Sequence, residues 1–441
     1  MENFDQLLDK YANLLIEKGI NVQKGDNVMI YIAIDQAPLA HHLAKHAYEN
    51  GARRVHFTWK DDYTTRLNYE YQATEDLAEV ADYTVARQED LILNQKVSRL
   101  SIVSGDPDLL NGIDASKIDT VQTNHGQKLK VVRTATMNDQ VKWTVAAAAD
   151  YGWAKHVFPE LAEDKQAATD ALWDAIFKAS RVYEADPVEA WNKHRDLLDE
   201  KAQKLNDKQF KKLHYTAPGT DLTLGLPEGH IWVSAQSFNP DGSPFIANMP
   251  TEEVFTAPDT NVMDGYVTST KPLSYAGSTI EGIKVTFADG KIIDVTADKG
   301  EQIMKDLVFN NDGAQGLGEV ALVPHKSPIS QSNLTFYNTL FDENASNHLA
   351  IGAAYPTNVK GGTDMSEEEL QAAGVNRSHV HVDFMIGSAE MDIDGIDADG
   401  NVFPIFRQGE WAFQFSNRHY RHKQVKGGYL CRLIPKIMKT I

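Results

Sequence analysis

The segment 378–387, with the sequence SHVHVDFMIG, contains the most suggestive set of chemically active side chains. Side chains alternate between the two faces of a β-strand, so His379, His381 and Asp383 are expected on one face and apolar residues on the other. Imidazole and carboxylate groups that lose water on a buried face need compensation, and a divalent cation provides it. The pattern therefore indicates a candidate metal-binding strand, with a solvent-facing strand edge as the alternative.

Three further polar residues occur in the segment 339–355. Glu343, His348 and Tyr355 follow one another at intervals of five and seven residues, which correspond to about one and a half and two turns of an α-helix. The spacing predicts a helix that begins near Asn344 and presents His348 and Tyr355 on one side. A capped amphipathic helix with a satisfied buried histidine is the alternative interpretation.

Two other motifs contain carboxylates. Glu319 lies in GAQGLGEVAL (313–322), after several glycines and at the start of an apolar run. These glycines are not typical of a phosphate-binding loop, because no Lys followed by Ser or Thr comes after them. Glu252 and Glu253 are adjacent in MPTEEVFTAPD (249–259), which we interpret as extended chain. Only one of two adjacent side chains in an extended segment can point inward.

The cysteine count narrows the kind of metal site. The chain of 441 residues has one cysteine, Cys431, which excludes an intramolecular disulfide bond and any site built from several thiolates. A bound metal would therefore use histidine, aspartate and glutamate side chains.

Alternating helix and strand patterns occupy the first part of the chain. The near-continuous apolar run in 28–34 is typical of a parallel strand buried on both faces. With the helical spacing in 4–15, it predicts a doubly wound α/β domain with a mostly parallel sheet over residues 1–214. Asp186 and Pro187 mark the start of a helix that closes this domain. No G-x-G-x-x-G motif follows a strand, so dinucleotide binding is not indicated.

A second domain of different character is predicted over residues 215–413. Short segments rich in Thr and Val follow TAPGTDL at 216–222, and the segment 284–297 has the pattern of a β-hairpin. We expect an α+β domain that carries the metal site. Residues 414–441 contain seven Lys and Arg residues and no acidic residue. We interpret them as a basic tail, either a non-native extension or a solvated arm, without an assigned function.

The acidic composition limits the partners of the protein. The 43 Lys and Arg residues against 62 Asp and Glu residues give a formal net charge of −19, which repels nucleic acids and anionic lipid surfaces. No apolar run approaches the roughly 18 residues that a membrane span requires. The N-terminal sequence MENFDQLLDK is acidic and not typical of a signal peptide. We therefore expect a cytoplasmic protein with no nucleic-acid or membrane partner.

Two weaker signals are interpreted as structural. His42 and His46 lie four residues apart on a predicted helix, but the Glu of an H-E-x-x-H motif is missing, so a solvated helix face is expected. The acidic run 392–400 does not fit the ligand pattern of an EF-hand loop and is expected to form an acidic turn.

Taken together and in order, the motifs resemble those of the aminopeptidase T family of metallopeptidases, which includes the aminopeptidase S and PepS types. The resemblance extends over about residues 1–413 and ends near the motif PIFRQGEWAF. It is carried by PTEEVFTAPD with Glu253, GLGEVALV with Glu319, LFDENASNHLAIGAAYP with Glu343, His348 and Tyr355, and SHVHVDFMIGS with His381 and Asp383.

The resemblance implies a metalloaminopeptidase that releases N-terminal amino acids from short peptides through a metal-activated water in a dinuclear site. It implies two divalent metal ions, zinc or cobalt, with magnesium or manganese as further candidates. It also implies a homodimer. The metal ligands that it implies are Glu253, Glu319, Glu343, His348, His381 and Asp383.

Catalytic roles follow from the resemblance and from the chemistry of two-metal centres. Tyr355 is expected to donate a hydrogen bond to the oxyanion, and Glu319 or Glu343 to take a proton from water and pass it to the leaving amine. Two alternatives stay open, a two-metal hydrolase of another amide or a phosphoester, and an inactive protein that binds metal or peptide. A requirement for a free α-amine on the substrate would separate the first alternative from an aminopeptidase.

Overall fold

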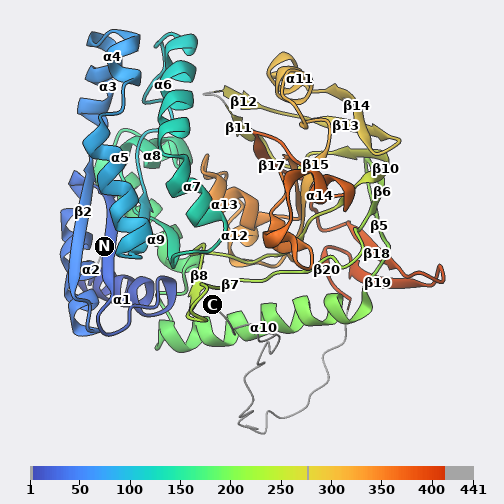
Figure 1. Cartoon of the computed structure of the whole chain (residues 1–441), viewed down its shortest axis with the longest axis horizontal. Helices are drawn as coiled ribbons and strands as arrows, with labels where there is room; N and C mark the ends of the chain where they lie inside the picture. Colours follow the sequence, from blue (N-terminus) through green and yellow to red (C-terminus); the bar gives the residue numbers. More distant parts are fainter. Residues whose placement is uncertain (1–2, 276–277, 413–441) are drawn as a thin grey trace, which may run out of the picture.

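Figure 1 shows a computed structural model of the chain, which describes residues 3–275 and 278–412. The helices of the first half lie beside a β-rich second half, and the long helix α10 (Pro187–Lys208) runs along the lower edge of both. The basic tail predicted at 414–441 lies outside the described residues. None of the described helices is long and apolar enough to cross a membrane.

The first half is built around a parallel sheet with the strand order β2-β1-β3-β4. This arrangement confirms the predicted α/β class. The strands are β1 (Asn27–Ala33), β2 (Arg54–Lys60), β3 (Ser98–Val103) and β4 (Trp143–Ala147). The helices are α1 (Phe4–Leu14), α2 (Ala37–Glu49), α3 (Asp62–Tyr71), α4 (Thr74–Ala78), α5 (Asp82–Glu89), α6 (Ala115–Lys128), α7 (Lys130–Met137), α8 (Tyr151–Val157), α9 (Lys165–Ala179) and α10.

Strand β1 lies inside this sheet because its residues are apolar on both faces. Val28, Met29 and Ile30 are fully buried, as expected for a strand that helices cover on both sides. Helix α10 begins as predicted, since the Asp186 carboxylate accepts a hydrogen bond from the backbone N–H of Glu189. The local sequence therefore determines both elements.

The prediction of a solvated face on α2 is wrong. His42 and His46 both lie 3.0 Å from the Asp9 carboxylate of α1, and His46 is buried. The two imidazoles therefore join α2 to α1, because the neighbouring helix supplies an acceptor that both rings can share.

The second half contains an eight-stranded sheet with the order β14-β13-β10-β6-β5-β18-β19-β20. The predicted hairpin at 284–297 is present. The prediction of an acidic turn over 392–400 holds only for the end of that run, where Asp397 accepts N–H groups, because residues 392–396 pair with β5 as strand β18. The strands are β5 (Lys212–Ala217), β6 (Thr220–Gly225), β10 (Asp259–Thr268), β13 (Lys284–Ala288), β14 (Lys291–Thr296), β18 (Asp392–Ile396), β19 (Val402–Arg407) and β20 (Glu410–Trp411).

A smaller antiparallel sheet, ordered β17-β16-β15-β9, lies beside the large one. Its strands are β9 (Val254–Thr256), β15 (Leu317–Leu322), β16 (His348–Gly352) and β17 (His381–Met385). Every residue of β15 and β16 is buried. These sheets and short helices confirm the α+β class of the second half. The remaining strands and α-helices of the second half are β7 (Gln236–Phe238), β8 (Pro244–Ile246), β11 (Leu273–Tyr275), β12 (Ser278–Ile280), α11 (Glu301–Phe309), α12 (Pro328–Gln331), α13 (Thr339–Asp342) and α14 (Glu367–Ala372).

The two halves are joined by backbone hydrogen bonds between β4 and the segment 246–249, which we call the seam. The N–H of Val145 donates to the carbonyl oxygen of Ala247 at 2.8 Å, and the N–H of Met249 donates to that of Val145 at 2.9 Å. The segment therefore continues the parallel sheet past β4 and then leads directly into Glu253.

Candidate metal centre

Three strands of the smaller sheet place carboxylates and imidazoles on the same face. Glu319 of β15 lies opposite Ala350 of β16, which lies opposite Asp383 of β17. Directly paired residues share a face, and His348 and His381 share it too, because each is two residues from a member of this row. The small side chain of Ala350 leaves the space between the two carboxylates open.

A β-bulge at Gly318 brings Glu319 to this face. The pairing of β15 with β16 shifts by one residue there, so that Glu319 lies opposite Ala350. Without this shift Glu319 would lie opposite Leu349, whose side chain belongs to the hydrophobic core. A Cβ atom at Gly318 would lie 2.0 Å from the carbonyl oxygen of Ala353, so the bulge requires glycine.

The ligand-type atoms converge closely on one another. His348 Nε2 lies 3.2 Å from Glu253 Oε2 and 3.3 Å from Glu319 Oε1. His381 Nε2 lies 3.8 Å from Glu319 Oε2 and 3.5 Å from Asp383 Oδ1. The carboxylate of Glu319 therefore faces both imidazoles: its Oε1 faces His348 and its Oε2 faces His381.

The other ring nitrogen of each histidine is held by the backbone. His348 Nδ1 lies 3.0 Å from the carbonyl oxygen of Ser346, and His381 Nδ1 lies 2.7 Å from that of Ala353. A carbonyl oxygen only accepts, so Nδ1 carries a hydrogen in both rings and the neutral ring presents its Nε2 lone pair to the carboxylates. Metal-binding histidines are commonly oriented in this way.

The carboxylates make this face strongly negative, and the pKa values of its groups reflect that charge. Burial opposes the charged form of His348, but the two glutamates that it faces raise its pKa well above the usual value. Burial also opposes the charge on His381, whereas Asp383 and its neighbours raise the pKa to about 10. Burial, together with nearby carboxylates, raises the pKa of Glu343 well above its usual range. The face therefore attracts positive charge.

The chemistry of these atoms fits divalent cations. His348 Nε2 and Asp383 Oδ1 are buried and, within the described residues, have no hydrogen-bond partner. When the imidazoles are neutral, their lone pairs and those of the carboxylates are all acceptors and cannot satisfy one another, so either protons or metal cations must lie between them. Ligand atoms of Glu253, Glu319 and His348 lie within 4.8 Å of one another. Imidazole nitrogen and carboxylate oxygen together form a donor set that suits zinc and similar ions.

Glu343 and Tyr355 reach the same site from outside the sheet. Glu343 opens the short 3-10 helix η5 (Glu343–Ala345), and the ring of Tyr355 packs edge-on to His381 with the centroids 5.3 Å apart. The prediction of a helix through His348 is wrong, because residues 348–352 form the strand β16. A short apolar run fits either a strand or a buried helix, and its central place in the sheet decides between them.

Two sequence-based placements need correction. His379 precedes β17 and is exposed, so it does not join His381 on the face. Glu253 lines the cavity, as one member of the adjacent pair was expected to do, but Glu252 is buried as well.

Glu252 is buried because it pairs with a cation from the first half. Arg181, which follows α9, lies 2.8 Å from Glu252 Oε1. His194 of α10 lies 2.7 Å from the carbonyl oxygen of Thr251. These contacts hold the backbone immediately before Glu253, and no local sequence pattern indicates them.

Asn344 supports the site from the other side. Its Oδ1 accepts the backbone N–H of Glu252 at 2.7 Å, and its Nδ2 lies 3.4 Å from Glu343 Oε1. Asn344 is completely buried. It therefore connects the segment that carries Glu253 with the side chain of Glu343.

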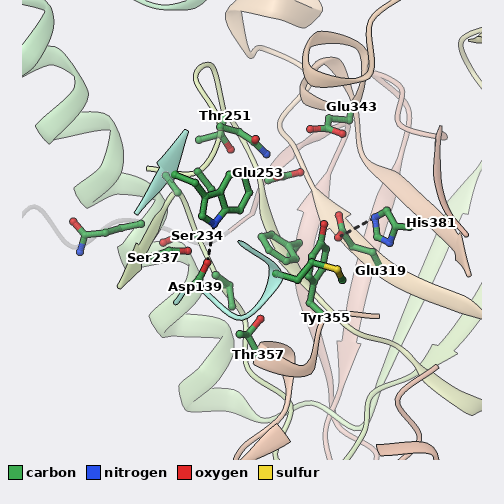
Figure 2. A pocket seen from close by; sticks show the side chains of 18 of the residues that line it. Asp139, Ser234, Ser237, Thr251, Glu253, Glu319, Glu343, Tyr355, Thr357 and His381 are labelled. Atoms are coloured by element: carbon green, nitrogen blue, oxygen red, sulfur yellow. Dashed lines mark hydrogen bonds and ion pairs between the residues drawn. The ribbon is translucent and has the colours of Figure 1, made fainter. Parts of the chain in front are cut away.

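The sheet face that carries Glu319, His348, His381 and Asp383, which we call the metal-ligand face, opens into a cavity of about 260 Å³. Figure 2 shows Glu319 and His381 on one side of it and Asp139, Ser234 and Ser237 on the other. Both halves of the molecule line the cavity, and its described lining contains neither lysine nor arginine. The lining from outside the metal-ligand face includes Met137, Asp139, Trp143, Val233, Ser234, Ser237, Phe255 and Thr357.

A second group of ligand-type residues lies beside the parallel sheet and consists of Asp106, Asp108 and His156. Lys155 lies 2.5 Å from Asp106 Oδ2, and His156 lies 3.0 Å from Asp106 Oδ1. Asp108 is exposed. Lys155 already supplies a cation to Asp106, and Asp108 reaches solvent, so the buried face is the better candidate metal centre.

Nearly the full described length of the chain is similar to known proteins. Residues 4–411 match the family described as thermophilic metalloprotease (M29). Aminopeptidase PepS of Streptococcus thermophilus is 57% identical over 412 residues, which are 93% of this chain and 99% of that protein. Aminopeptidase AmpS of Bacillus subtilis is 51% identical over 413 residues, 94% of this chain and 100% of that protein.

A solved structure has the same fold. Wild-type AmpT from Thermus thermophilus superposes with a TM-score of 0.87 at 37% identity, covering 93% of this chain and 100% of that chain. The family match and the fold agree with the buried set of metal-ligand residues. The chain therefore belongs to the thermophilic metalloprotease (M29) family and is a metal-dependent hydrolase of peptide bonds.

Proposed function

We propose that this metalloprotease is an aminopeptidase that releases N-terminal residues from short peptides with two divalent cations at the metal-ligand face. The observation that carries the proposal is the position of Glu319, which faces His348 with one oxygen and His381 with the other. A carboxylate shared between two cations would be placed in this way. Relatives 57% and 51% identical to the chain are named aminopeptidases. The proposed ligands are Glu253, Glu319, Glu343, His348, His381 and Asp383.

The charge of the site supports two ions rather than one. Four of the proposed ligands are carboxylates, and the described cavity lining has no lysine or arginine to balance them. Four negative charges equal the charge of two divalent cations, whereas one ion would leave buried negative charge uncompensated. Because the donor set mixes imidazole and carboxylate, zinc or cobalt is the proposed metal, with magnesium or manganese as weaker candidates.

Two residues of the chain are proposed to move the proton. When bound, the two cations polarise the scissile carbonyl, lower the pKa of a water molecule and hold the free α-amine. The carboxylate that metal does not saturate, Glu319 or Glu343, takes the proton from the attacking water and gives it to the leaving amine. Glu343 suits this task because burial and nearby carboxylates raise its pKa, so that it holds a proton more readily than an exposed glutamate.

Tyr355 is proposed to stabilise the oxyanion. Burial and the surrounding carboxylates raise the pKa of its phenol, so the hydroxyl stays protonated and remains a donor. Its packing against His381 fixes the ring beside the proposed ligands. A preorganised donor of this kind stabilises the charge that develops on the carbonyl oxygen.

The cavity also supports a restricted set of substrates. A volume of about 260 Å³, enclosed by both halves, accommodates a few residues of a short or unfolded peptide and excludes a folded chain. We propose a homodimer as the working state, from the resemblance to the aminopeptidase T family, and a cytoplasmic location. The net charge of −19 further supports a function without nucleic acid.

The proposal is tested with chelator-treated protein that is then supplied with zinc or cobalt. Leucine and alanine 4-nitroanilides should be cleaved only after metal addition, and their N-acetylated forms should not be cleaved at all. Equilibrium dialysis should give two bound ions per chain. Equal cleavage of the acetylated substrates would contradict the aminopeptidase assignment, and no cleavage despite two bound ions would indicate another substrate class or a binding role.

A further inference from the structure

One carboxylate of the cavity is not part of the metal-ligand face. Asp139 lies in the turn between α7 and β4 of the first half, whereas all proposed metal ligands come from the second half. In Figure 2 it lies with Ser234 and Ser237, across the cavity from Glu319 and His381. Asp139 is therefore available for a purpose other than binding the catalytic cations.

The side chain of Asp139 is held in place by its surroundings. The indole N–H of Trp143 donates to Asp139 Oδ1 at 3.0 Å, and the backbone turns sharply there with a φ of 51°. A carboxylate has about four lone-pair sites, so with Trp143 and Ser237 as donors Asp139 can still accept a hydrogen bond from a further donor. The orientation of the carboxylate is therefore set before any substrate binds.

Within the described chain, Asp139 has no cationic partner to balance its charge. Burial raises its pKa, and the groups that act in the opposite direction are the hydrogen-bond donors Trp143 and Ser237, with no lysine or arginine among them. A half-buried carboxylate without a counter-ion attracts a cation from outside. The lining of the same cavity also includes the apolar side chains of Met137, Val233 and Phe255.

We propose that Asp139 is a specificity residue that binds the cationic head of an N-terminal arginine or lysine side chain of the substrate. This inference rests on the proposed aminopeptidase function. Once two divalent cations balance the four carboxylates of the metal-ligand face, Asp139 is the carboxylate of the described cavity lining that still lacks a positive partner. The aliphatic stem of an arginine or lysine would pack along the apolar wall next to Trp143 while its head reaches the carboxylate.

The test compares arginine and citrulline 4-nitroanilides, because citrulline has nearly the shape of arginine but no charge. With the metal-loaded wild-type enzyme, kcat/KM should be about tenfold to a hundredfold higher for arginine, as for a charge-assisted hydrogen bond in a partly buried site. Asp139→Asn keeps the acceptor for the Trp143 indole but removes the charge, so the two substrates should become nearly equal. The matched control Asp241→Asn removes a charge from the exposed turn after β7, outside the cavity, and should keep the wild-type preference.

Equal wild-type rates for arginine and citrulline, or an unchanged preference in Asp139→Asn, would overturn the inference. Failure of the proposed function has a different signature, because the leucine, arginine and citrulline anilides would then all resist the metal-loaded enzyme. A second measurement does not depend on the variant folding. Argininamide should inhibit the wild-type enzyme more strongly than citrullinamide, and added salt should reduce the difference. Equal inhibition by the two amides would also overturn the inference.

Discussion

The two groups of acidic and histidine side chains in this molecule have similar compositions but different surroundings. Beside the parallel sheet, Asp106 is paired with Lys155 and His156 at 2.5 and 3.0 Å. On the antiparallel sheet, His348 faces two buried glutamates, and the described cavity lining contains no lysine or arginine. Proximity alone therefore does not indicate a metal site. Buried negative charge that the chain leaves uncompensated is the better indicator.

The same residue types also have different partners in the two sheets. At the ends of the parallel strands, Asp61 accepts backbone N–H groups at the start of α3, and Asp150 does so at the start of α8. On the antiparallel face, backbone carbonyls hold Nδ1 of His348 and His381 and leave Nε2 directed at carboxylates. The first arrangement stabilises helices, and the second presents unsatisfied ligands.

The largest effect is expected from His348→Ala. Loss of this ligand should lower kcat/KM by at least about a thousandfold, because the cations supply several kcal/mol of transition-state stabilisation. Bound metal, measured by elemental analysis, should fall below the wild-type content. His156→Ala is the matched control from the other sheet and should retain both metal and activity. Metal loss in the control alone would show that the group around Asp106 is the metal site.

A somewhat smaller effect is expected from Tyr355→Phe. Removal of the hydroxyl donor should lower kcat by about a hundredfold to a thousandfold, as found when one oxyanion donor is removed. The ring stays in place, so metal content should not change. A loss of metal in proportion to the loss of activity would make Tyr355 a structural residue, and an unchanged kcat would remove it from the mechanism.

Arg181→Met tests whether the buried ion pair next to the site matters more than the partly exposed pair beside the parallel sheet. Glu252 would be left buried without a counter-ion, which should lower the free energy of unfolding by about 3–5 kcal/mol. Weaker support of Glu253 should reduce metal affinity by about tenfold to a hundredfold. Lys155→Met, which removes the cation beside Asp106, should change stability by less than about 1 kcal/mol and leave metal affinity unchanged. Equal losses of stability and of metal affinity in Arg181→Met and Lys155→Met would contradict the expected difference between the two ion pairs.

The last prediction concerns the stability of the chelator-treated protein as a function of pH. His381 has a pKa of about 10 in the folded chain, against an ordinary value of about 6.5 in the unfolded chain. Its contribution to stability is therefore complete below about pH 6.5 and is lost as the pH rises through the folded value. The free energy of unfolding, measured with urea, should decrease across this range.

The zinc-loaded protein and the variant His381→Gln test whether the imidazole proton causes this decrease in stability. Loading with zinc should remove the decrease, because the metal replaces the proton on Nε2. Without metal, His381→Gln should weaken the decrease, and His348, whose pKa is also raised, should contribute the part that is left. Constant or rising stability of the chelator-treated wild type across the same range would contradict the assignment of positive charge to the face.

Elements whose stability depends on local sequence were predictable. The apolar run of β1, the Asp186 cap of α10 and the hairpin β13–β14 each contain their own signal. The proposed ligands lie in short motifs that resemble a known family, so they too could be named before their positions were known. Their common face could not be deduced, because it depends on the pairing of four strands from distant parts of the chain.

The errors and omissions share a physical cause. The sequence HLAIG after Asn347 is short and apolar, so its own periodicity does not separate strand from helix, and the neighbouring strands decide. Arg181 meets Glu252, and Asp139 reaches the cavity, only because the two halves pack together. Contacts of this kind leave no local pattern to recognise.

The seam between β4 and residues 246–249 determines how the cavity can change shape. It joins the wall that carries Trp143 to the segment that carries Glu253. A hinge motion between the halves would have to break these hydrogen bonds or pull Glu253 away from His348. The seam therefore resists a change in the distance between the wall around Trp143 and the segment that carries Glu253. Amide protons of Val145 and Met249 should accordingly exchange with solvent only when the molecule unfolds.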